Sequence, residues 1–491
     1  MLLARTALLW LFVAAVFACV LFADFLPLPF GDYASQRFTL VGLSAAVVTV
    51  CAAVLVKRYG LRAFKDCGPA FFVASAFIIL SWPFSGAQHV WVEPGMYAVF
   101  FLGFVLAGSL SGRGGQTSSW VVAIVYVGAA AVALYGGSTI TVYLFALSDG
   151  VTNLSDYIPW GFVSIRYWSH IATWLIPLMP LAVLVGPFKD ERLWRFFVAL
   201  GTALWWWVVF LSTSRGTMLG LAFGVLLVIV LLGRSALPWL KIVIQHLIYG
   251  GLVWALLSGI VPWLLLDEVN IRALKTDSSG RMPLFIEALS MSFENFPFGM
   301  GPQSWLTHAV LTDEYERSPK FAHPHNMYLM WAAEYGWLLI SALLVLVAQA
   351  SRLFWRRRRE ARSHGGSQLA LPLAGFTASV SSALLHAGVS AVFIAPGSMM
   401  VGFVVLSTFW AIIAADALPH KSEMPLGRAL SAGSVGLLLG LICYVWLSEV
   451  ANYHKAMDSD QQFYFDNVPE GRLPRFWFHG NFPRRSELMP R

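Results

Sequence analysis

The chain has 491 residues, of which 58% are hydrophobic and 12% charged, with a formal net charge of +7 at pH 7. Soluble globular domains carry about 25% charged residues, so this composition excludes an ordinary soluble protein. The positive charge does not indicate a nucleic-acid-binding protein, because the basic residues cluster in short loops between apolar segments.

Apolar segments long enough to cross a bilayer recur along the chain. Each has roughly 18–25 residues, and a helix of that length spans about 30 Å of hydrocarbon. A transmembrane β-barrel would instead show short alternating segments. We therefore predict an all-α polytopic membrane protein with about 12–13 transmembrane helices. The predicted spans are 1–24 (a first helix rather than a signal peptide), 38–56, 68–85, 94–111, 119–137, 167–187, 195–212, 216–233, 240–265, 327–350, 368–388, 393–415 and 429–448.

One segment fits this pattern poorly. Residues 138–150 follow a predicted span directly, and they could form a re-entrant or interfacial piece.

The distribution of basic residues predicts the orientation of the spans. Several short loops are rich in Lys and Arg, and the run 356–359 consists of four consecutive arginines. Such loops are typical of the cytoplasmic side, so we place them and the N-terminus there. The opposite side of the membrane then receives the segments 150–166, 212–215, 267–326 and 449–491. The most unusual polar features of the sequence therefore share one side.

Two arginines lie at the outer, non-cytoplasmic ends of predicted spans. Arg166 comes just before a span, where an arginine often extends its side chain toward lipid headgroups. Arg215 lies in the turn Ser212-Thr213-Ser214-Arg215-Gly216, only a few residues long, between two hydrophobic spans. A guanidinium beside three hydroxyl groups favours an anion-binding corner, because its planar fork matches phosphate oxygens.

The long loop 267–326 contains a predicted helix over 282–293. Arg281 would lie in its first turn, where a cation is unfavourable unless an anion binds there. Asp277 or Ser279 could cap the helix. An apolar stripe along it suggests that it lies on the membrane surface or over a cavity: Leu284, Phe285, Ala288, Leu289 and Phe293. The following turn, 297–302, has glycines that allow close backbone approach.

His323-Pro324-His325-Asn326 ends this loop, directly before the span 327–350. Proline favours an extended or helix-start backbone, so His325 or Asn326 should stand at the outer end of the next helix. A neutral imidazole is a competent general base near neutral pH, and a protonated one can bind phosphate. His170 and His386, each near a helix end, are expected to be structural or interfacial.

No metal or other cofactor is predicted. Two histidines at i and i+2, without a nearby cysteine or an H-E-x-x-H pattern, make a poor zinc site. The four cysteines lack metal-ligand spacing and are expected to behave as buried hydrophobic residues: Cys19, Cys51, Cys67 and Cys443.

Taken together, these motifs resemble the superfamily of bacterial inner-membrane glycosyltransferases that includes O-antigen ligases, Wzy-type polymerases and protein O-oligosaccharyltransferases. His325-Asn326, followed after nine residues by Gly336, is similar to the family's histidine motif. Leu339 stands where the motif usually has Gly, Thr or Tyr, a departure from the lipopolysaccharide ligase branch in particular. The turn 212–216 is similar to the family's S-x-S-R-G turn. Residues 161–178 and 280–301 resemble its arginine-bearing segment and the loop before its histidine.

The resemblance implies a GT-C-like helical bundle in the bacterial inner membrane, with the active site facing the periplasm. It also implies an undecaprenyl-diphosphate-linked glycan donor and an inverting, metal-independent transfer to an acceptor hydroxyl. Arg166, Arg215 and Arg281 would then hold the diphosphate. His325 would deprotonate the acceptor or bind phosphate, with His323 and Asn326 supporting it.

The expected organisation has four parts. N-terminal transmembrane helices (1–150) precede a catalytic core (151–350) that includes the periplasmic loop 267–326. C-terminal transmembrane helices (351–448) and a periplasmic tail (449–491) follow.

The sequence leaves three candidates for the molecule that accepts the glycan. It could be the lipid A core, as for an O-antigen ligase, a pilin or other protein Ser/Thr, or another lipid-linked glycan, as for a polymerase. Membrane lipids are the other expected partners, and nucleic acid is not. A transporter of a lipid-linked anion would also use arginines, but transporters usually show internal repeats and polar residues near the mid-membrane. A structural scaffold does not account for arginines in such tight turns.

Overall fold

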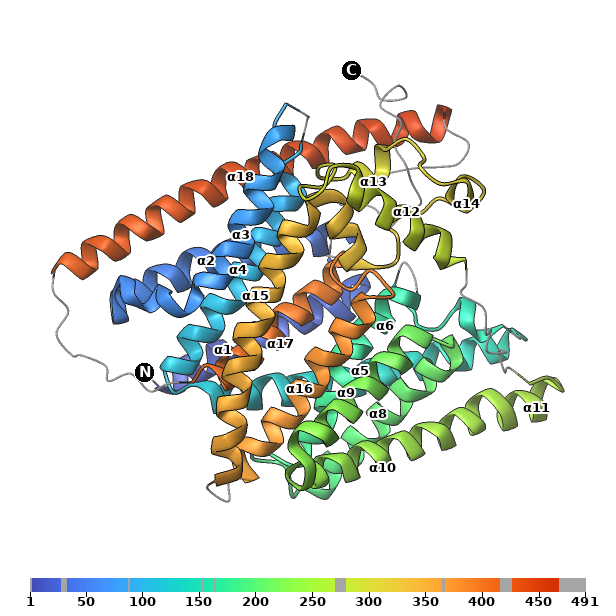
Figure 1. Ribbon diagram of the computed structural model, residues 1–491. Coiled ribbons are helices and arrows are strands. Elements are labelled where there is room, and N and C mark those ends of the chain that lie inside the picture. The colour runs from blue at the N-terminus through green and yellow to red at the C-terminus, as the bar shows by residue number, and fades with distance from the viewer. Residues whose placement is uncertain are drawn as a thin grey trace.

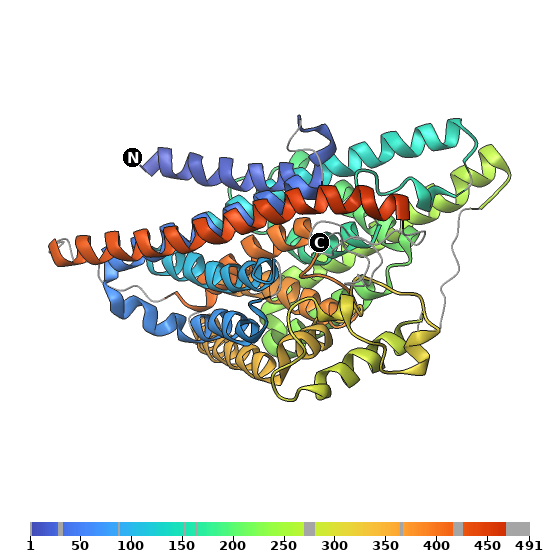
Figure 2. The same cartoon turned by 90° about the horizontal axis from the view of Figure 1, so that it is seen from above.

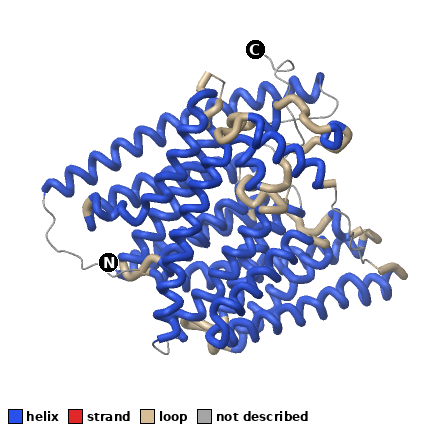
Figure 3. Tube along the Cα trace, viewed as in Figure 1, coloured by secondary structure: helices blue, strands red, loops and turns tan. Residues whose placement is uncertain are grey.

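The computed structural model describes residues 2–27, 33–86, 89–151, 153–162, 165–269, 280–363, 367–415 and 426–467. These residues form helices joined by loops and short 3₁₀ turns, and they contain no β-strand (Figures 1 and 3). Ten helical stretches among them are long and apolar enough to cross a membrane. The prediction of an all-α polytopic membrane protein is confirmed.

Each predicted span falls on a helical segment. In chain order the α-helices are α1 (Leu2–Leu21), α2 (Tyr33–Tyr59), α3 (Gly68–Ser81), α4 (Val92–Arg113), α5 (Thr117–Ser148), α6 (Ile165–Leu175), α7 (Met179–Ala182), α8 (Arg192–Ser212), α9 (Arg215–Leu232), α10 (Leu237–Trp254), α11 (Val261–Leu266), α12 (Arg281–Glu294), α13 (Ser304–Thr307), α14 (Asp313–Glu316), α15 (Met327–Ser363), α16 (Ser367–Ala387), α17 (Pro396–Ile413) and α18 (Leu426–Asn467).

The count of ten stretches differs from the predicted 12–13 for local reasons. Residues 215–266 count as one stretch, although they contain two predicted spans, α9 and α10 with α11. The apolar part of α1 that the structure describes, Ala7–Leu21, is shorter than the others. The predicted span 167–187 is divided between α6, a 3₁₀ turn and α7, each of the last two starting with a proline in its first turn, because proline cannot continue the backbone hydrogen bonding of a helix.

Two predicted boundaries are wrong. No re-entrant piece forms at 138–150, because α5 continues unbroken to Ser148. Gly136 within it leaves room for Leu204 of α8, whose side chain would lie 3.0 Å from an added Cβ. The last span also does not end near residue 448, since α18 continues as a helix to Asn467. Residues 468–491 of the predicted tail lie outside the described residues.

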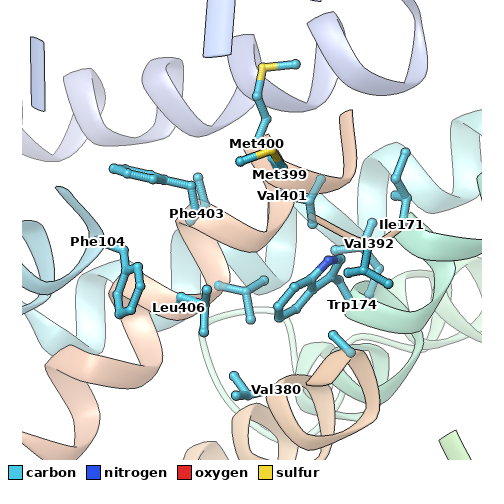
Figure 4. Close-up of a cluster of buried hydrophobic side chains, with 14 of the residues drawn as sticks. Phe104, Ile171, Trp174, Val380, Val392, Met399, Met400, Val401, Phe403 and Leu406 are labelled. Atoms are coloured by element: carbon cyan, nitrogen blue, oxygen red, sulfur yellow. The ribbon is translucent and has the colours of Figure 1, made fainter. Parts of the chain in front are cut away.

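The core of the bundle surrounds α17, which packs against α4, α6 and α16. The Trp174 indole of α6 lies against Val392 and α17 (Figure 4). Its Nε1 donates a hydrogen bond to Ser398 Oγ at 3.2 Å. Gly402 provides the space, because an added Cβ would lie 2.9 Å from the Trp174 ring. This contact fixes α6, and therefore the loop before it, on the central helix.

Helices α9 and α15 carry different polar residues at their two ends. α9 begins at Arg215, and the carbonyl of Leu231 at its other end accepts hydrogen bonds from Arg358 and Arg362 of α15. α15 in turn begins just after His325 and ends in the basic run. The basic run and the Arg215–His325 end therefore lie at opposite ends of the same helices. The side of the membrane on which each end lies stays a prediction from the basic loops.

The loop between α11 and α15 forms a small lobe that contains α12, α13 and α14. Seen from above, it lies across the molecule from α1 and α18 (Figure 2). The lobe has a hydrophobic core of its own: Leu284, Ala288, Met291, Trp305, Leu306, Tyr315, Ala322 and Ala333.

Candidate active site

The His323–Asn326 segment forms the cap of α15. The Asn326 side-chain oxygen accepts hydrogen bonds from the backbone N–H groups of Tyr328 (3.0 Å) and Leu329 (3.1 Å). These are the bonds of a helix N-cap, and they satisfy donors that would otherwise lack partners. The prediction that this segment stands at the beginning of the next helix is confirmed, and Asn326 is the capping residue.

His325 is held in an uncommon backbone conformation. Its φ is +58°, in the left-handed region, where a non-glycine residue is disfavoured. The backbone N–H of His325 donates to Nδ1 of His323 at 3.1 Å. The two imidazole rings consequently lie 4.4 Å apart at an angle of 80°. The tight turn fixes the direction of the His325 ring.

The His325 imidazole is buried, with 4% of its surface exposed. Its Nδ1 has no hydrogen-bond partner among the residues that the structure describes. Burial lowers the pKa of His325 well below its usual value, and the neighbouring His323, Arg166, Arg281 and His170 lower it further. The ring is therefore neutral at pH 7 and keeps an unshared electron pair that can accept a proton.

The structure brings the three predicted arginines together. Arg166 lies in the first turn of α6, Arg215 begins α9 and Arg281 begins α12. The Arg281 guanidinium is half-buried and donates from Nη1 to the Val389 carbonyl at 2.9 Å. Burial lowers the pKa of Arg281, and repulsion from Arg166 and Arg215 adds to the effect. All three cations therefore lie near one another at the N-terminal ends of helices, where the helix dipole also favours an anion.

The predicted helix of the loop exists, but its apolar residues face two ways. Leu284, Ala288 and Met291 are buried in the lobe, whereas Leu289 and Phe293 are exposed. The single stripe predicted from the sequence is therefore wrong, because at about 100° per residue these positions fall on different faces. The proposed caps, Asp277 and Ser279, lie outside the described residues.

The glycine-containing turn after α12 packs directly on the backbone of α15. Gly336 interrupts α15 with φ +79° and ψ 175°. The N–H groups of Met300 and Gly301 donate to the carbonyls of Ala333 and Glu334, both at 2.8 Å. A Cβ on Gly336 would lie 2.0 Å from the Pro297 carbonyl oxygen. The glycine ten residues after Asn326 therefore fastens the lobe to the helix that carries His325.

A buried acidic group, which was not predicted from the sequence, holds the lobe together. Glu287 of α12 is fully buried and accepts from His308 Nε2 and the Leu311 N–H at 2.8 Å, and from Thr312 Oγ1 at 2.5 Å. His308 Nδ1 faces the Ser304 and Trp305 carbonyls. The available signal was a glutamate on the apolar face of a helix, which must find partners when buried.

An apolar cavity of about 480 Å³ lies beside the site, between α7, α8, α9 and α10. Its lining includes Phe210 and Met218, which lie on either side of the Arg215 turn.

No cluster of three or more His, Cys, Asp or Glu side chains that could hold a metal ion is found in the described part of the chain.

Part of the chain resembles a known protein family. Residues 198–344 match the family model described as O-Antigen ligase. No curated protein matches the chain significantly. The matched segment contains Arg215, Arg281, His325 and Gly336, whereas Arg166 lies before it.

Proposed function

We propose that this member of the O-antigen ligase/Wzy-type superfamily moves a glycan from an undecaprenyl-diphosphate carrier to an acceptor hydroxyl. We place it in a bacterial inner membrane with its active site on the periplasmic side. The observation that carries the proposal is the gathering of Arg166 and Arg215 near Arg281, with Arg166 and Arg281 also close enough to the buried His325 to lower its pKa.

The arginines would bind the diphosphate of the donor. Guanidinium groups can each engage two phosphate oxygens, and their positions at helix ends add favourable electrostatics. Their mutual repulsion in the free protein is relieved when an anion of two or more charges enters. The adjacent cavity, lined almost entirely by apolar side chains, would accommodate the first isoprene units of the carrier.

His325 would act as the general base. Its low pKa argues for this role over that of a charged phosphate ligand, because the imidazole is neutral at pH 7. The acceptor oxygen would attack the anomeric carbon of the first sugar while its proton passes to His325. The bond from that carbon to the phosphate oxygen would break, with inversion at carbon. The arginines would stabilise the charge that develops on the departing diphosphate, so the mechanism requires no metal.

A transporter fits this arrangement less well. Its charged residues are expected near the mid-membrane, whereas Arg215 and His325 stand at the ends of α9 and α15. A polymerase would use the same chemistry with a second lipid-linked glycan as acceptor.

The test is transfer by the purified protein in phospholipid vesicles. A radiolabelled undecaprenyl-diphosphate glycan would be offered with lipid A core, with a pilin, or alone. We expect a labelled product with lipid A core or pilin, and roughly 10²–10⁴-fold less of it from His325→Ala. Products formed only by lengthening of the lipid-linked glycan would make the protein a polymerase. Intact donor under all three conditions, with wild-type protein that is folded, would refute glycan transfer.

A further inference from the structure

A chain of buried hydroxyl and imidazole groups lies directly under the arginine cluster. We call Thr173, Thr217 and His386 the polar junction. Thr173 Oγ1 lies 3.3 Å from Thr217 Oγ1 and 2.9 Å from His386 Nδ1. All three side chains are buried, with at most 2% exposed. They come from α6, α9 and α16, so the junction joins three helices whose residues are far apart in the sequence.

The junction reaches the Arg215 turn by a hydrogen bond and by close packing. Ser214 comes directly before Arg215, and its Oγ lies 3.0 Å from Thr217 Oγ1. Gly216 comes directly after Arg215 and faces the His386 ring, so that an added Cβ would lie 2.6 Å from His386 Nε2. Both neighbours of Arg215 are therefore fixed by the junction. The glycine of the S-x-S-R-G turn is required here because no side chain fits between the turn and His386.

The junction also extends toward Arg281. The His386 ring lies 5.0 Å from the ring of His170, whose Nε2 is 2.7 Å from Ser390 Oγ. Ser390 follows Val389, whose carbonyl accepts the hydrogen bond from Arg281. One buried polar cluster thus contacts the backbone beside two of the three arginines.

Such a cluster is costly to bury unless its groups satisfy one another. Thr173 Oγ1 lies 2.9 Å from the Ser169 carbonyl four residues earlier in α6, as Thr408 does from its own i−4 carbonyl in α17. Thr217 of α9 reaches the same Ser169 carbonyl at 3.1 Å, and Thr173 also meets His386 of α16, whereas Thr408 bonds only within its own helix. The polar junction meets the turn on both sides of Arg215, through Ser214 and through Gly216. This placement indicates that the junction acts on the position of Arg215.

We propose that His386, with Thr173 and Thr217, is a positioning element that holds the Arg215 guanidinium in line with the anion that the site binds. This inference rests on the proposed function, since it takes that anion to be the diphosphate of a lipid carrier. None of the three residues is required to touch the substrate.

The test is binding of undecaprenyl diphosphate to the purified full-length protein in detergent. We expect Thr217→Val and His386→Leu to weaken binding about tenfold. Thr217→Ser, which keeps the hydroxyl, and His386→Asn, which keeps a polar atom at the Nδ1 position, should bind as the wild type does. The matched control is Thr408→Val, which removes a buried threonine hydroxyl that bonds only within α17 and should leave binding unchanged.

Two combinations separate positioning from loss of structure. In an Arg215→Gln background, Thr217→Val should cause no further loss, because residues that act through one group are not additive. Gly216→Ala should weaken binding through its clash with His386, and Gly216→Ala with His386→Asn should recover it, because asparagine lacks the atoms at the Nε2 position. Thermal unfolding of every variant shows whether it is folded.

The outcomes distinguish the two proposals. Wild-type protein that does not bind the probe would overturn the proposed function together with this inference. Wild-type binding that is unaffected by folded Thr217→Val and His386→Leu would overturn the inference alone. An equal further loss in the Arg215→Gln background would also overturn it.

Discussion

The two ends of α9 and α15 use arginine in opposite ways. At the basic end, Arg357 donates to the Ile412 carbonyl at 2.9 Å, and Arg358 and Arg362 donate to the Leu231 carbonyl. These carbonyls belong to the last turns of α17 and α9, where the helix dipole favours cations. At the other end, Arg166, Arg215 and Arg281 lie at helix beginnings, where the dipole disfavours them, and they repel one another.

The surroundings of the arginines indicate different roles at the two ends: a membrane anchor at the basic end and an anion-binding site at the other. Arginines that meet helix carbonyls and water are stable by themselves, and they set the orientation of the spans. Arginines that lie at helix beginnings and repel one another favour the binding of an anion between them. The same residue type therefore predicts topology at one end and a ligand at the other.

The largest expected effect is at His325. His325→Ala should reduce glycan transfer by roughly 10²–10⁴-fold, the usual contribution of a general base, while the protein still enters the membrane. The measurement is transfer in vesicles, normalised to protein content. His89→Ala is the control, because His89 pairs with Glu449 away from the site and should remain active. Full activity of His325→Ala would remove the catalytic assignment.

The next prediction compares the two ends directly. Arg215→Lys should lower kcat/KM for the donor by about 10–100-fold, because a point charge does not reproduce a bidentate fork. Arg358→Lys, at the basic end, should change it less than about twofold, since lysine keeps the positive charge and the site lies at the other end of α15. Similar losses in both variants would show that the arginine cluster has no special role.

A third prediction concerns Gly336, where the turn 297–301 of the lobe packs on α15. Gly336→Ala should destabilise the protein by about 2 kcal/mol or more, because the residue needs a positive φ and its Cβ would meet the backbone of the 297–301 turn. Gly42→Ala is the matched control. A Cβ at Gly42, within α2, meets nothing within 4 Å, so we expect no loss of stability there. Thermal unfolding in detergent compares the two, and equal midpoints would contradict the contact.

The sequence predicts some of these features better than others. The spans follow from the lengths of the apolar segments, and the arginines of the site could be recognised because each is exceptional in its immediate surroundings. The Glu287–His308 pair, the contact at Gly336 and the junction at His386 could not. Each joins residues that are 20 to more than 200 positions apart, and nothing in the flanking residues indicates the partner. The exposed half of α12 was mistaken for part of one stripe because periodicity alone does not say what each face contacts.

The smallest expected effect is a displacement of the pH profile. Burial and the nearby cations lower the pKa of His325, so its neutral form persists as the pH falls below 6.5. Since the neutral form is the base, kcat/KM should stay level through pH 6.5 and decline only at lower pH. Arg281→Gln removes one of the cations that oppose protonation, so the acid decline should move to higher pH, whatever the loss in overall rate. Arg358→Gln at the basic end should leave the profile in place, because a charge at the far end of α15 is well beyond the screening length of about 8–10 Å. A profile that moves equally in both variants would mean that the cations around His325 do not act on it through their proximity.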